Sequence, residues 1–204
     1  MFVISTRLFI AVLVETLLVL SAVPALAYAG YFPYSYRMAP AFIVIFLSLF
    51  RMFQEKWTLQ KLGLAPSQPF AGLSVHLTLT FLGATFTYAF ITWYYKDWRP
   101  FPLQGWMVAV SLFLSFVQEL IFRTFMIESL EDRNWKKWQI LWLTSLTFSF
   151  IHIIYPHHTL MFMALTFAFS WMATLLYFRY RNLYLVTLSH FVLNLLVLYL
   201  GLHT

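Results

Sequence analysis

The feature that most constrains this chain is a series of seven long apolar segments, separated by short connections rich in proline or charge. Each segment comes close to the roughly 20 residues with which a helix crosses the hydrocarbon core of a bilayer. The segments cover approximately residues 7–29, 40–54, 70–95, 103–128, 138–155, 159–178 and 182–202. We therefore expect an all-α fold, a polytopic transmembrane helix bundle of about seven spans.

The composition is that of a chain dissolved in lipid rather than in water. Hydrophobic residues make up 62% of the 204 residues and charged residues only 10%, whereas a soluble domain carries about 25% charged residues. Neither a repeat nor a long linker divides the sequence, so we expect residues 1–204 to form a single transmembrane domain with its motifs in residues 103–202. Cysteine is absent, which excludes disulfides, thiol catalysis and cysteine-bound metals.

The net charge of +6 does not indicate a nucleic-acid partner, because the basic residues are scattered among the connections between spans. Basic residues in short loops tend to stay on the cytoplasmic side of a membrane. With the N-terminus inside, the outer side holds Arg37, Lys96 and Arg99. The inner side holds nine: Arg7, Arg51, Lys56, Lys61, Arg133, Lys136, Lys137, Arg179 and Arg181. We therefore expect an inside N-terminus and an outside C-terminus.

The first apolar segment allows two interpretations. Arg7, the apolar run and the small residues near 25–29 resemble a cleavable signal peptide. Glu15 interrupts the apolar run, however, and a protein with several spans can use its first span as its own insertion signal. We favour a retained first helix.

Several later spans contain polar residues that lipid does not tolerate. The fourth span carries Glu119 and Arg123, the fifth carries His152, and the seventh carries His190 and Asn194. A charged group at the centre of a bilayer costs at least about 2.5–3.5 kcal/mol on insertion scales, so such residues normally face the interior of the bundle. The first and last pairs have i,i+4 spacing, which places both members on one face of a helix. We expect these side chains to converge in one buried site.

Such a set of side chains can hydrolyse an amide. A carboxylate and an imidazole together can hold and deprotonate a water molecule. A second imidazole and a carboxamide can donate hydrogen bonds to the developing oxyanion, and such donors act strongly where water is excluded. No Gly-x-Ser-x-Gly nucleophile motif is present.

The order of these residues resembles the signature of the CAAX protease and bacteriocin-processing (CPBP, or Abi) family of intramembrane proteases. The family motifs are Glu-Glu-x-x-x-Arg, Phe-x-x-x-His and His-x-x-x-Asn/Asp, on separate transmembrane helices in that order. The matching positions are Gln118-Glu119-x-x-x-Arg123, Phe148-x-x-x-His152 and His190-x-x-x-Asn194. The resemblance covers roughly residues 103–202, about half of the chain. Three motifs in the right order are a far more specific signal than any one of them.

The resemblance implies a glutamic-type endopeptidase that cleaves a membrane-associated protein or peptide with an activated water, without a required metal or cofactor. His152 would help the motif glutamate to activate the water, while His190 and Asn194 would stabilise the oxyanion. Arg123 would hold Glu119 in place. Family members process prenylated tails, bacteriocin leaders or sorting tails. The small size is typical of bacterial or archaeal members, so we expect a bacterial or archaeal plasma membrane.

One position departs from the family pattern. Gln118 stands where the family has its first glutamate, which is thought to be the general base, and a carboxamide cannot accept a proton at neutral pH. Three explanations are open: an isosteric change that traps an inactive enzyme, a natural protein that uses Glu119 as the base, or a natural pseudoenzyme. Adjacent helical residues point about 100° apart, so Glu119 could take over this role only in a rearranged site.

Other functions compete with the protease. The main alternative is a catalytically silent membrane protein of the same fold that acts in immunity or regulation. A transporter would often show internal repeats and broken helices, which this sequence lacks. A zinc protease with Glu119, His152 and His190 as ligands is a further alternative, although His-Glu-x-x-His is absent. The expected partners of the leading hypothesis are a membrane-anchored substrate and the lipid bilayer, without nucleic acid.

Each motif also allows a structural interpretation. Glu119 and Arg123 could form an ion pair that only fixes helix packing. His152 could be a core histidine bonded to a backbone carbonyl, and the polar residues of the last span could be interhelical hydrogen-bonding groups. Glu15 and His76 are isolated polar residues of the first and third spans, which we expect inside the bundle without an assigned role.

Overall fold

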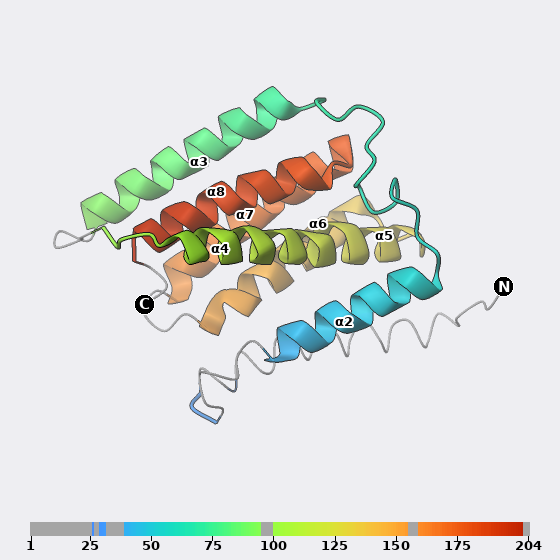
Figure 1. Cartoon of the computed structure of the whole chain (residues 1–204), viewed down its shortest axis with the longest axis horizontal. Coiled ribbons are helices and arrows are strands. Elements are labelled where there is room, and N and C mark those ends of the chain that lie inside the picture. Colours follow the sequence, from blue (N-terminus) through green and yellow to red (C-terminus); the bar gives the residue numbers. More distant parts are fainter. Residues whose placement is uncertain (1–25, 27–28, 32–38, 95–99, 155–158, 202–204) are drawn as a thin grey trace. The chain divides into compact units, whose positions relative to one another are not determined.

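The structure is a computed structural model that describes residue 26 and residues 29–31, 39–94, 100–154 and 159–201. Helices dominate this part of the chain, and no strand occurs in it (Figure 1). In chain order they are α2 (Ala39–Gln54), α3 (Leu73–Tyr94), α4 (Gly105–Glu119), the π-helical η2 (Leu120–Phe125), α5 (Met126–Glu131), α6 (Lys137–Phe150), the 3-10 helix η3 (Ile151–Ile154), α7 (Thr159–Tyr180) and α8 (Leu183–Tyr199). The predicted all-α fold is confirmed.

Three helical stretches are long and apolar enough to cross a membrane, namely Leu73–Tyr94, Gly105–Glu131 and Leu160–Tyr180. Two shorter helical stretches, Ile45–Gln54 and Leu183–Tyr199, are also apolar. These helices agree with an integral membrane protein. The count of seven spans stays a prediction, and the first predicted span lies almost entirely outside the described residues.

The fourth predicted span is one continuous helical stretch with a π-helical segment inside it. α4, η2 and α5 follow one another from Gly105 to Glu131, and η2 begins directly after Glu119. A π-turn holds an extra residue compared with an α-turn and is frequent at functional sites. All six residues of η2, Leu120–Phe125, are buried. The π-helical segment therefore lies where the first family motif lies.

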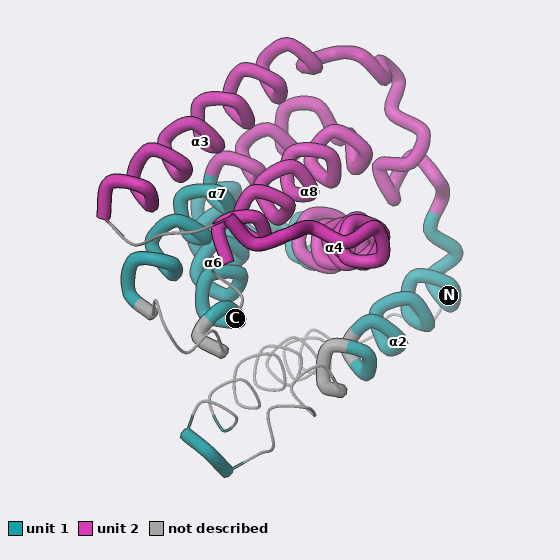
Figure 2. Tube along the Cα trace, turned by 60° about the vertical axis from the view of Figure 1, so that its left-hand side comes forward, with its two compact units in different colours: residues 1–57, 126–171 teal, residues 58–125, 172–204 magenta. Residues whose placement is uncertain are grey.

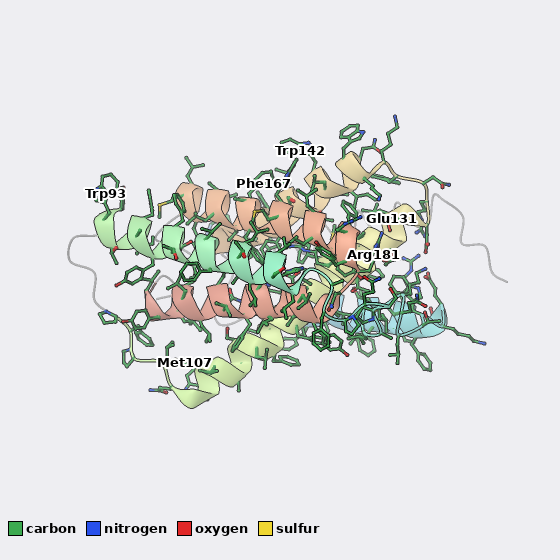
Figure 3. The ribbon with its side chains drawn as sticks, turned by 90° about the horizontal axis from the view of Figure 1, so that it is seen from above. Trp93, Met107, Glu131, Trp142, Phe167 and Arg181 are labelled. Atoms are coloured by element: carbon green, nitrogen blue, oxygen red, sulfur yellow. The ribbon has the colours of Figure 1, made fainter. Side chains whose placement is uncertain are left out.

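The chain forms two compact units, which Figure 2 distinguishes by colour. One consists of residues 1–57 and 126–171, and the other of residues 58–125 and 172–204. In the first unit, α5 packs against α6. The α6 ring of Trp142 packs on Phe167 and Trp171 of α7, with ring centroids 5.7 and 4.8 Å away (Figure 3). Large aromatic contacts of this kind hold the helices of this unit together.

In the second unit, α8 lies between α3 and α4 and packs against both (Figures 1 and 2). The outer faces of these helices are apolar. Phe81, Phe86 and Trp93 of α3 are 70%, 61% and 74% exposed, a degree of aromatic exposure that suits lipid rather than water. Trp93 lies at the C-terminal end of α3 (Figure 3), where interfacial tryptophans are common in membrane helices.

The connection from residue 58 to residue 72 ties the beginnings of α3 and α8 together. Leu183 N–H donates to the Gly63 carbonyl at 3.0 Å, and the Asn182 side chain donates to the Pro69 carbonyl at 2.7 Å. Asn182 also caps α8, since its side-chain oxygen accepts a hydrogen bond from Leu185 N–H at 3.2 Å. These bonds fix where α8 begins within this unit.

Candidate active site

A row of polar residues runs along one face of the helical stretch from α4 into η2. Ser111, Ser115, Glu119 and Arg123 follow one another at intervals of four residues, and all four are buried. Side chains at this spacing lie one above the other on the same helix face. Because these groups cannot face lipid, this face of α4 turns toward the interior of the protein.

Glu119 is the centre of the cluster. Its Oε2 lies 3.0 Å from Nε of Arg123, and both side chains are fully buried. Its Oε1 lies 2.7 Å from Nδ1 of His190 on α8, whose side chain is 3% exposed. The predicted ion pair and the predicted convergence of the fourth and seventh spans are thus present within one unit.

A second interhelical bond lies one turn away. Nδ2 of Asn194 donates to Oγ of Ser115 at 3.0 Å. Glu119 pairs with His190, and Ser115, four residues earlier on α4, pairs with Asn194, four residues later on α8. The two helices are therefore antiparallel, and a four-residue step on one matches a four-residue step on the other.

The bond between Glu119 and His190 restricts the proton positions on the imidazole. An ionised carboxylate only accepts hydrogen bonds, so Nδ1 of His190 carries the proton and donates it. A neutral ring then has its lone pair on Nε2, which is the arrangement of a histidine general base oriented by a carboxylate. If Nε2 takes up a proton, the neighbouring carboxylate stabilises the imidazolium that results.

Gln118 precedes Glu119 on α4 and is partly exposed. Its side chain makes no hydrogen bond to any other residue within the described ranges. Its neutral carboxamide thus differs from the neighbouring Glu119, which contacts both Arg123 and His190. The general base of the family signature is therefore missing at this position, as the sequence indicates.

His152 belongs to the other compact unit, where it is the second residue of the 3-10 helix η3 that follows α6. Nδ1 of its ring lies 2.6 Å from the carbonyl oxygen of Phe148, so this nitrogen carries the proton and donates it. The two rings also pack together, with centroids 4.8 Å apart. This bond fixes the tautomer, as both the structural and the catalytic interpretation of His152 require. Its convergence with the other motifs stays a prediction.

Sequence reasoning missed the place of Ser115 in the cluster and the contact that His76 makes with α8. Ser115 carries no family motif, and the signal that points to it is its four-residue spacing from Glu119. His76, expected in the interior without a role, is 2% exposed, and its Nδ1 lies 3.2 Å from Oγ of Ser189, the chain neighbour of His190.

Within the described residues, no group of three or more histidine or acidic side chains is placed to hold a metal ion. The metal-free mechanism stays a prediction.

The comparisons with known proteins identify a family. Residues 99–196 match the family model described as type II CAAX prenyl endopeptidase, Rce1-like. The match begins before α4 and ends within α8, so it includes all three motifs, whereas His76 precedes it. Neither the comparison with curated proteins nor that with solved structures gives a match. The chain belongs to the CAAX protease and bacteriocin-processing family of membrane proteases.

Proposed function

We propose that the protein is an intramembrane endopeptidase of glutamic type that cleaves membrane-anchored proteins or peptides with an activated water. The observation that carries the proposal is the 2.7 Å bond between the Glu119 carboxylate and the His190 imidazole, both buried in an apolar helix bundle. Burial of such a costly pair is typical of a functional site in a membrane protein. The substrate class follows from the family, whose model describes an endopeptidase for prenylated tails.

In this proposal the pair of Glu119 and His190 replaces the carboxylate that Gln118 cannot supply. Nε2 of His190 takes a proton from water while the water oxygen bonds to the carbonyl carbon of the scissile amide. The carbonyl oxygen becomes an oxyanion, and the imidazolium is stabilised by Glu119. The C–N bond then breaks, the proton passes to the leaving nitrogen, and an acid and an amine are released.

The remaining motif residues support this reaction. Asn194 has two amide hydrogens on Nδ2, and one of them is donated to Ser115. The other is available as a donor to the oxyanion. Arg123 lies against the second oxygen of Glu119 and brings a positive charge to that carboxylate in an apolar setting. His152 assists the water, the role that the family resemblance implies.

A second candidate function is a silent membrane protein of the same fold that binds a partner without cutting it. One observation favours it, namely that Gln118 occupies the position of the first motif glutamate. A carboxamide there preserves shape and polarity but removes the proton acceptor. The two candidates differ in whether the unmodified chain cleaves any protein.

The test compares the termini of membrane-associated proteins by mass spectrometry in the native host. The strains express the unmodified chain, Gln118→Glu, His190→Phe, His152→Ala, Gln118→Glu combined with His152→Ala, or the control Thr80→Val on α3. We expect new termini with the unmodified chain and with the control, and their loss with His190→Phe and with His152→Ala.

Two other outcomes would change the assignment. New termini that appear only with Gln118→Glu, and vanish when His152→Ala is added, would show a protease fold blocked at this residue. The pair of Glu119 and His190 would then not be the base. Identical termini in all strains, with each variant folded and inserted at the same level, would refute the protease and leave the silent binder.

A further inference from the structure

His76 is a buried histidine that neither the family motifs nor the proposed reaction uses. It lies near the beginning of α3, in the same compact unit as Glu119 and His190, and is 2% exposed. Its backbone N–H donates to the Gly72 carbonyl at 2.8 Å, and its ring lies 6.1 Å from the ring of Tyr180. The position of this imidazole is therefore well determined by its surroundings.

The ring of His76 makes one hydrogen bond to another helix. Nδ1 of His76 and Oγ of Ser189 on α8 are 3.2 Å apart. Polar contacts between membrane helices hold them in a particular rotation as well as together. The contact of His76 therefore acts on α8 at the residue directly before His190.

The geometry of α8 links this contact to the candidate site. Adjacent residues of a helix point about 100° apart, so Ser189 points toward α3 while His190 points toward Glu119 on α4. A rotation of α8 about its axis would move both side chains together. Because α8 lies between α3 and α4, a bond on the α3 side opposes a rotation that would withdraw His190 from Glu119.

Packing alone does not explain a histidine at this position. Nε2 of His76 is buried and has no hydrogen-bond partner among the residues that the structure describes. A buried nitrogen without a partner costs free energy that an apolar side chain of similar size would not. The benefit that offsets this cost is the bond to Ser189.

We propose that His76 is a positioning residue of the candidate active site, which acts through Ser189 to hold α8 in the rotation that brings His190 to Glu119. The proposal assigns no contact between His76 and substrate. Its consequence for cleavage rests on the proposed function, whereas its consequence for the bond between His190 and Glu119 does not. The two parts can therefore be tested separately.

The first test uses nuclear magnetic resonance of the full chain in lipid nanodiscs, with isotope-labelled histidine rings. The sequence has only six histidines, so the His190 signals can be assigned by substitution. We expect the Nδ1 proton signal of His190 to move upfield, as a weakened hydrogen bond requires, with His76→Leu and with Ser189→Ala. The control Thr80→Val, one turn along α3 from His76, should leave it unchanged. An unchanged His190 signal in His76→Leu would overturn the proposal whether or not the protein is a protease.

Two conservative variants separate the ring nitrogens. The amide of asparagine falls near the position of Nδ1, whereas that of glutamine falls near the position of Nε2. We therefore expect the Nδ1 proton signal of His190 to keep its position with His76→Asn and to move upfield with His76→Gln. The opposite pattern would mean that Nε2 is the important nitrogen and would refute a role through Ser189.

The second test measures cleavage of the substrate found by the terminus comparison. We expect His76→Leu and Ser189→Ala each to lower kcat about 100-fold, the order of effect of a misplaced catalytic group, with little change in KM. The double variant should be no slower than either single variant, because both remove the same bond. Multiplied effects, or a change confined to KM, would refute the positioning role.

Discussion

Replacement of Arg123 by methionine is expected to lower the free energy of unfolding by about 3–5 kcal/mol, the usual cost of removing one partner of a buried ion pair. Both charged groups are fully buried and 3.0 Å apart. At an effective dielectric constant of about 20, their attraction is roughly 5.5 kcal/mol. Burial of two charges in a membrane helix costs about 5–7 kcal/mol on insertion scales. The intact pair is therefore nearly neutral, and the cost appears only when one charge is removed.

The double variant Glu119→Gln with Arg123→Met distinguishes this reasoning from simple loss of contacts. It removes both charges, and the glutamine oxygen can still accept the hydrogen bond from His190. We expect it to recover most of the stability lost in Arg123→Met, and to show no cleavage. Unfolding by sodium dodecyl sulfate in mixed micelles, followed by tryptophan fluorescence, measures the free energy of unfolding of the single and the double variant. Arg179→Met, at an exposed position of α7, is the control and should change stability by less than about 0.5 kcal/mol. A double variant as unstable as Arg123→Met would refute the argument.

Three further predictions use the connection before α3 and the proposed chemistry. Gly72 has a φ of +81°, and a Cβ there would lie 2.5 Å from the Tyr180 ring. Gly72→Ala should therefore lower the free energy of unfolding by about 1–3 kcal/mol in the same assay. The control Gly105→Ala should not, because a Cβ at Gly105 would meet open space. Asn182→Ala should cost about 1–2 kcal/mol through loss of the α8 cap, and Asn182→Asp should cost at least as much, because it keeps the cap but sets a buried carboxylate oxygen against the Pro69 carbonyl in place of the donor. Incubation with a metal chelator should leave cleavage of the identified substrate unchanged, and a loss that added zinc restores would favour the zinc-protease alternative instead.

The lengths of the apolar runs, and the prolines and charges between them, predicted most of the described helices to within a few residues. The segments predicted at 159–178 and 182–202 correspond to α7 (Thr159–Tyr180) and α8 (Leu183–Tyr199), because prolines and charges interrupt apolar runs where helices end. The π-helical segment after Glu119 was not predicted, since it depends on how α4 packs and leaves no periodic signal in the sequence.

The candidate site was predictable only in part. The four-residue spacing of Glu119 and Arg123 placed them on one helix face, and the ion pair follows from this local geometry. The contact of Glu119 with His190 depends on the antiparallel register of α4 and α8, which no local pattern determines. The role of Ser189 could not be inferred for the same reason, because its partner His76 is 113 residues away in the chain.

The ion pair between Glu119 and Arg123 also has a consequence for biogenesis, since both partners belong to one helical stretch. As this stretch enters the bilayer, the two charges can neutralise each other without a partner from α8. The insertion machinery then receives a segment with no net charge at this level. His190, which is translated about 70 residues later, joins a carboxylate that is already in place. The order of synthesis thus makes docking of α8 the step at which the polar cluster becomes complete.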